Sequence, residues 1–118
     1  MHRGIRMLAA TGGWLCLAII LVASFVPSSS ANLGGSDKLG HFLAYSALSA
    51  CWIAAGEASV RRLAIVFLGC VVLGGAVELL QPLLQRDAGW LDAGANTAGS
   101  LFGVFLGWLC DRLIVQKL

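Results

Sequence analysis

The stretch LAIVFLGCVVLGGAVELLQPLL, residues 63–84, decides the fold. A bilayer core of roughly 30 Å is crossed by about 20 apolar residues in a helix, and this run meets that length. It is apolar almost throughout, yet it carries Glu78 and Gln81 near its end. An ionisable group within a span costs on the order of 2.5–3.5 kcal/mol on insertion scales, so it normally faces other helices. The run therefore predicts a membrane-spanning helix whose polar groups meet partners elsewhere in the chain.

Three further apolar runs cover residues 7–26, 39–55 and 90–115, separated by stretches rich in Gly, Ser, Asp or Pro. The chain is 58% hydrophobic and 12% charged, whereas a soluble domain has about a quarter of its residues charged. The first run, preceded by basic residues, also resembles a secretory signal, but it exceeds the 7–15 apolar residues of a signal core. We therefore predict one all-α domain over residues 1–118, an integral membrane bundle of four transmembrane helices.

The basic residues predict how this bundle is oriented. If the runs alternate in direction, one side of the membrane receives Arg3, Arg6, Arg61, Arg62, Arg112 and Lys117. Only Lys38 and Arg86 fall on the other side. Because Lys and Arg accumulate in cytoplasmic loops, both termini should lie in the cytoplasm of a bacterial inner membrane. The formal net charge of +2, without a basic patch interleaved with aromatic residues, excludes nucleic acid as a partner.

Polar residues from three runs are predicted to meet at the outer side. Asp37, His41 and Tyr45 recur every four residues and so share one helix face, and Glu78 and Gln81 likewise share a face. We expect a polar pocket that opens outward between the second, third and fourth helices. Its candidate ligand-binding residues are Asp37, Lys38, His41, Tyr45, Glu78, Gln81, Arg86, Asp92 and Asn96.

Small residues continue the same face of the fourth run. Gly99, Gly103 and Gly107 follow Asp92 and Asn96 at helical spacing. Such a stripe lets another helix approach closely. The partner can be a helix of the same chain or of a second copy, so the stripe leaves a homo-oligomer open.

Two of these stretches resemble the signatures of the VanZ-like membrane protein family. DKLGHFLAYSALS, residues 37–49, resembles the first, with Asp-Lys, a histidine, an aromatic residue and a tyrosine. ELLQPLLQRDAGWLDAGANTAGSLFG, residues 78–103, resembles the second, with Glu-x-x-Gln, an arginine and Asp-x-x-x-Asn-x-x-Gly. The motifs cover about half of the chain, in the family's order. The matching positions are Asp37, Lys38, His41, Phe42, Tyr45, Glu78, Gln81, Arg86, Asp92, Asn96, Gly99 and Gly103.

The resemblance implies a multi-pass inner-membrane protein of the cell envelope. The family's namesake is associated with low-level resistance to the glycopeptide antibiotic teicoplanin. The residues themselves favour an outward site for a polar headgroup, because two helices point their positive N-terminal ends at it. Membrane lipid, a polyprenyl-phosphate-linked or peptidoglycan-related precursor, and the glycopeptide are the candidate partners.

Three other interpretations remain open from the sequence. As an intramembrane hydrolase or transferase, the protein would use His41 as base and Glu78 or Asp92 as acid, but no Ser or Cys nucleophile lies at that depth. A proton-coupled carrier would use the same acids and histidine as a relay. The polar groups can also serve only as interhelical hydrogen bonds, each worth about 0.6 kcal/mol.

We expect neither a cofactor nor a metal ion. The four cysteines fall one to each apolar run, and none forms a CxxC pair. No ligand spacing such as HxxxH accompanies the acids. Buried cysteines without such spacing act as small apolar residues.

Overall fold

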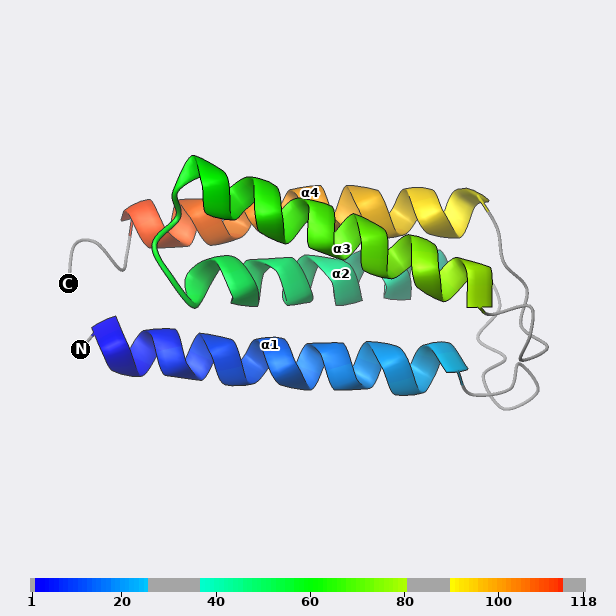
Figure 1. Ribbon diagram of the computed structural model, residues 1–118, viewed down its shortest axis with the longest axis horizontal. Helices are drawn as coiled ribbons and strands as arrows, with labels where there is room; N and C mark the ends of the chain where they lie inside the picture. Colours follow the sequence, from blue (N-terminus) through cyan, green and yellow to red (C-terminus); the bar gives the residue numbers. More distant parts are fainter. Residues whose placement is uncertain (1, 26–36, 81–89, 114–118) are drawn as a thin grey trace.

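The chain folds into a bundle of helices. The computed structural model describes residues 2–25, 37–80 and 90–113, and these form four α-helices and no strand (Figure 1). The helices are α1 (His2–Phe25), α2 (Asp37–Ala54), α3 (Val60–Leu80) and α4 (Trp90–Leu113). The start of α1 and the end of α4 lie at one end of the bundle, beside the turn that joins α2 to α3 (Figure 1). The opposite end holds the start of α2, the end of α3 and the start of α4 (Figure 1).

The helices have the length and surface of membrane spans. Within α1, α3 and α4, the segments Arg3–Ala23, Val60–Leu80 and Ala93–Leu113 are long and apolar enough to cross a bilayer. The apolar part of α2, Leu39–Ala54, is shorter. Large apolar side chains such as Leu8, Val72 and Phe105 are exposed on the outside of the bundle. Soluble monomers rarely expose apolar surface on this scale. The prediction of an all-helical fold is confirmed for the described residues, and three of the helices are long and apolar enough to cross a membrane.

Helix boundaries differ from the predicted spans by a few residues, and the reasons are local. The helix α3 begins at Val60, before the two arginines, because Ser59 caps it: its Oγ accepts from the backbone N–H of Arg62 at 3.2 Å. The helix α1 begins at His2, well before the apolar run. The helix α2 includes the polar turn from Asp37 and ends at Ala54. The predicted ends at residues 26, 81–84 and 114–115 lie outside the described residues.

The central helix of the bundle is α2. It contacts all three other helices, and its interface with α4 is the most extensive. Ile20 of α1, Tyr45 and Leu48 of α2 and Cys70 of α3 form a buried apolar cluster on one side of it. Residues of α2 therefore face every neighbour, and α2 is the helix on which the polar site is organised.

The glycine stripe of α4 lies against α2 of the same chain. A Cβ atom added at Gly99 would clash with the carbonyl oxygen of Phe42, and one at Gly103 with Ser49 Oγ and the carbonyl oxygen of Ser46. At Gly107 the added atom would lie 2.6 Å from Ile53 Cβ. The two backbones approach this closely because these positions carry no side chain.

Candidate functional site

The site is centred on a contact between α2 and α4. His41 Nδ1 lies 2.7 Å from Asn96 Oδ1, although the two residues are 55 positions apart in the chain. A carbonyl oxygen only accepts, so with the amide in this orientation Nδ1 carries the hydrogen and donates it. In the neutral ring, Nε2 is then the acceptor nitrogen. Asn96 thus orients the imidazole at the end of the bundle where α2 and α4 begin (Figure 1).

Buried polar side chains from all three helices surround this contact. Tyr45 is 2% exposed, Asn96 1% and Glu78 8%. Gly74, one turn before Glu78 on α3, faces Asn96: an added Cβ would lie 3.2 Å from Asn96 Nδ2. Tyr45 in turn lies within electrostatic range of Cys70 and Glu78. Tyr45, Glu78 and Asn96 therefore converge on one region between α2, α3 and α4.

Two atoms of this region have no hydrogen-bond partner within the described part of the chain. They are the hydroxyl of Tyr45 and the amide nitrogen Nδ2 of Asn96, and each is inaccessible to solvent. A buried polar group left in this state costs about 1–3 kcal/mol. Native structures keep such groups rarely, and a bound water or ligand is a common reason.

Serine hydroxyls extend the polar interface only a short way along the bundle. Ser46 Oγ donates across the interface to the carbonyl oxygen of Gly99 at 3.0 Å, and Ser100 Oγ donates to that of Asn96 at 2.8 Å. Ser49 Oγ donates to its own helix, to the carbonyl oxygen of Tyr45. Beyond Ser49, Ile53 is fully buried against Gly107. The polar region is therefore bounded by apolar packing on the side of the chain ends.

The side chains of the other predicted ligand-binding residues lie outside the part of the chain that the structure describes. Asp37, Lys38 and Asp92 lie in the first turns of α2 and α4, and their side chains are outside the described part. Gln81 and Arg86 lie outside the described residues altogether. The structure thus brings together His41, Tyr45, Glu78 and Asn96, and leaves the proposed roles of the other residues as predictions.

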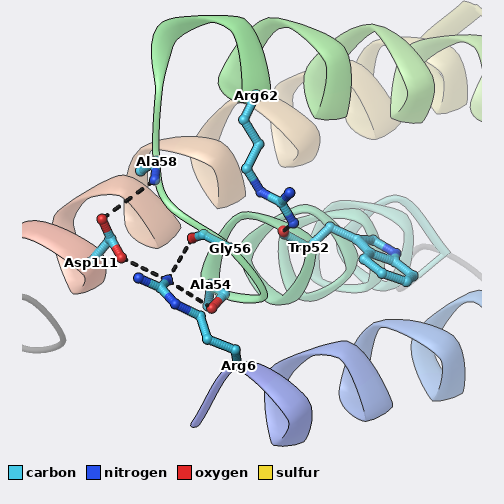
Figure 2. Close-up of polar contacts among 7 residues, drawn as sticks. All are labelled: Arg6, Trp52, Ala54, Gly56, Ala58, Arg62 and Asp111. Atoms are coloured by element: carbon cyan, nitrogen blue, oxygen red, sulfur yellow. Dashed lines mark hydrogen bonds and ion pairs between the residues drawn. The ribbon is translucent and has the colours of Figure 1, made fainter. Parts of the chain in front are cut away.

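A second polar cluster, at the opposite end, was not anticipated from the sequence. Arg6 of α1 forms an ion pair with Asp111 of α4, with 2.7 Å between Nη1 and Oδ1 (Figure 2). The same guanidinium donates to the carbonyl oxygens of Ala54 and Gly56 at the end of α2. Asp111 Oδ2 accepts from the backbone N–H of Ala58. We call Arg6, Asp111 and the carbonyls of Ala54 and Gly56 the clamp.

Arg62 makes a further hydrogen bond to α2 beside the clamp. Its Nη2 donates to the carbonyl oxygen of Trp52, and its guanidinium lies over Gly56, where an added Cβ would be 2.7 Å from Cζ (Figure 2). The last carbonyls of a helix lack partners within the helix, so these arginines satisfy the end of α2. From the sequence, Arg6 and Arg62 predict only which side of the membrane each faces.

One signal in the sequence pointed to the clamp. Asp111 is an acid within the apolar run 90–115, and it is fully buried. An acid in that position needs a partner from another helix. Neither helical spacing nor proximity in the chain links Asp111 to Arg6, so the identity of the partner depends on the packing of α1.

The chemistry available at the site is hydrogen bonding and proton exchange. His41, Tyr45, Glu78 and Asn96 can orient a polar group and donate to or accept from it. Within the described segments, no group of three or more His, Cys, Asp or Glu residues is placed to hold a metal ion. The four cysteines are free thiols.

Comparison with protein-family models, with curated proteins and with solved structures returns no match for this chain. The resemblance to VanZ-like proteins consequently rests on the two motifs alone.

Proposed function

We propose that this protein is a VanZ-like, four-span protein of the bacterial inner membrane with both termini in the cytoplasm. Its function is to bind the polar headgroup of a cell-envelope lipid in the outer leaflet. The candidate ligands are a membrane phospholipid, a polyprenyl-phosphate-linked peptidoglycan precursor and a glycopeptide that recognises such a precursor.

The observation that carries this proposal is the burial of Glu78 beside the His41–Asn96 contact. Glu78 is 8% exposed and lies near the end of an otherwise apolar helix. Interhelical hydrogen bonds in membranes contribute about 0.6 kcal/mol each, which is less than the cost of inserting an acid. Packing alone therefore accounts poorly for Glu78, whereas a binding site for a polar group accounts for it well.

The position of the site supports a ligand that enters from one side. The polar residues lie near the start of α2, the end of α3 and the start of α4, which is the end remote from the chain termini (Figure 1). In the other direction Ile53 packs against Gly107, and the clamp ties α1, α2 and α4 together. This arrangement favours binding from the outer leaflet over passage through the bundle.

Lipid binding is tested by native mass spectrometry of the purified protein in detergent. We expect the wild-type protein to retain phospholipid, and the variants Glu78→Gln and Asn96→Leu to lose at least tenfold in affinity, about 1.4 kcal/mol. The matched control is Thr97→Val, because Thr97 is exposed on the neighbouring position of α4. It also loses a polar side chain but should bind as wild type does.

Two outcomes would overturn the proposal. One is a protein that binds no phospholipid, undecaprenyl phosphate or glycopeptide at micromolar concentration while it keeps its helical content. The other is a pair of site variants that bind as tightly as Thr97→Val, which would leave the polar cluster as interhelical hydrogen bonding only.

A further inference from the structure

The two unpartnered atoms indicate which chemical group the ligand presents to the site. Tyr45 and Asn96 are nine-tenths or more buried, and the Tyr45 hydroxyl and Asn96 Nδ2 have no hydrogen-bond partner in the described residues. An amide nitrogen only donates, and a phenol hydroxyl donates more strongly than it accepts. Each of the two atoms therefore calls for an oxygen atom that accepts a hydrogen bond.

Both atoms belong to the same region of the bundle. Asn96 Nδ2 faces Gly74 of α3, and Tyr45 interacts with Cys70 and Glu78, which flank Gly74 by one turn on each side. His41, one turn before Tyr45 on α2, holds the other end of the Asn96 amide. The absence of a side chain at Gly74 lets α3 approach the Asn96 amide closely.

The charges around this region select the kind of oxygen. A phosphate oxygen buried here would carry negative charge close to the Glu78 carboxyl, and two negative charges in one buried place are unfavourable. A hydroxyl group suits the region better, because it accepts from Tyr45 or Asn96 and donates to the carboxylate. A carboxylate accepts several hydrogen bonds, so other contacts of Glu78 do not prevent this.

We propose that Tyr45, Asn96 and Glu78 form a buried subsite for a hydroxyl group of a polyol headgroup, either glycerol or a sugar. This inference rests on the proposed function and narrows its ligand to lipids that carry a free alcohol.

The depth of the subsite fits such a headgroup. Tyr45 lies eight residues into α2, about 12 Å from the first residue at 1.5 Å per residue. Side chains of a helix lean toward its N-terminus, so the phenol hydroxyl is shallower than the Tyr45 backbone. The phosphate of a lipid headgroup can then lie level with the first turn of α2, while a hydroxyl of the same headgroup lies level with Asn96.

The test compares two lipids that differ only in the hydroxyl groups of the headgroup, and a third that carries a sugar. Phosphatidylglycerol and phosphatidylpropanol with the same oleoyl chains have equal charge and size, but the second lacks both free hydroxyls. Monoglucosyl diacylglycerol supplies sugar hydroxyls without phosphate. We expect native mass spectrometry of the full chain to show about tenfold tighter binding of at least one hydroxylated lipid than of phosphatidylpropanol. The preferred lipid identifies glycerol or sugar as the source.

Two variants assign the preference to the subsite. Tyr45→Phe removes only the phenol oxygen, and Asn96→Asp removes the amide donor while keeping the oxygen that contacts His41. Each should reduce the tenfold preference to about twofold or less. Thr97→Val, the loss of an exposed hydroxyl, should keep the full preference. Helical content and melting temperature are measured for each variant to show that it folds. The comparison of lipids on the wild-type protein does not depend on the variants.

The outcomes separate this inference from the function on which it rests. Equal binding of all three lipids, weakened by Glu78→Gln, would overturn the hydroxyl subsite and keep the headgroup site. A hydroxyl preference that survives in both folded variants would overturn the roles of Tyr45 and Asn96. A wild-type protein that binds none of the lipids would overturn the proposed function itself.

Discussion

At the scale of single residues, two acids are buried in the part of the bundle that the structure describes, and their surroundings differ. Asp111 has an identified cation, Arg6, whose side chain is 17% exposed, and a backbone N–H from Ala58. Glu78 lies within electrostatic range of Tyr45 and one turn after Gly74, which faces Asn96. A buried carboxylate paired with arginine is explained by folding. The polar surroundings of Glu78 are the basis of the proposed binding site.

The clamp predicts that loss of Arg6 destabilises the protein more than loss of the Asp111 charge. Arg6→Gln leaves the carboxylate of Asp111 buried without its cation and should cost about 3 kcal/mol. Asp111→Asn should cost less, because Arg6 still donates to the carbonyls of Ala54 and Gly56. The double variant should lose less than the sum of the two single variants, since both act on one interaction. Unfolding of the purified protein in detergent measures all three.

The control for the clamp is Arg3→Gln, because Arg3 is exposed on the same helix. It should leave the free energy of unfolding within about 0.5 kcal/mol of wild type. A loss equal to that of Arg6→Gln would mean that net charge, and not the ion pair, stabilises this end of the bundle.

At the scale of helices, the interface between α2 and α4 positions the site. The missing side chains at Gly99, Gly103 and Gly107 let α4 lie directly on the backbone of α2. That close approach brings Asn96 within hydrogen-bonding distance of His41 and lets Ser46 reach the carbonyl oxygen of Gly99. Separation of the two helices would therefore disrupt the site as well as the packing.

The close packing of α4 on α2 at its glycines predicts that one added methyl group lowers the stability of the protein. In Gly103→Ala the added Cβ would overlap Ser49 Oγ and the backbone of Ser46, and overpacking of this kind costs about 1–3 kcal/mol. The matched control is Gly75→Ala on α3, where an added Cβ meets nothing within 4 Å. It should be neutral or stabilising by up to about 1 kcal/mol, since alanine favours helix over glycine. Equal melting temperatures for the two variants would contradict the packing of α4 on α2.

At the scale of the whole molecule, the helices alternate so that the start of α1 and the end of α4 share one end of the bundle and the site occupies the other (Figure 1). The clamp joins the start of α1, the end of α2 and the end of α4 at the first end. The described basic side chains of α1, α3 and α4 lie toward this end too. The excess of basic residues in cytoplasmic loops then predicts which end faces the cytoplasm.

The orientation is tested by reporter fusions in bacteria. A green fluorescent protein fused after Leu118 should fluoresce, and an alkaline phosphatase fused there should be inactive, because that enzyme requires an oxidising compartment to form its disulfides. Phosphatase fused after Ser30 should be active. An active phosphatase at Leu118 would place the site on the cytoplasmic side and contradict a ligand in the outer leaflet.

Much of the site was visible in the sequence as a set of residues. The repeat of Asp37, His41 and Tyr45 and the repeat of Asn96, Gly99 and Gly103 each mark one face of a helix, because helical geometry fixes the face on which a residue lies. The spacing does not say which face of another helix it meets. The contact between His41 and Asn96 and the convergence of Tyr45 and Glu78 come from packing.

The sequence by itself determined that the chain is helical and where the apolar spans and polar turns lie, because the length of an apolar run and its polar interruptions are local properties. The tertiary structure alone decided that Arg6 pairs with Asp111, that Ile53 closes one side of the polar region against Gly107, and that Tyr45 and Asn96 are buried with unpartnered polar atoms. These features join helices far apart in the chain. They depend on the rotation and approach of each helix, which the fit of side chains across the interfaces sets and no local pattern encodes.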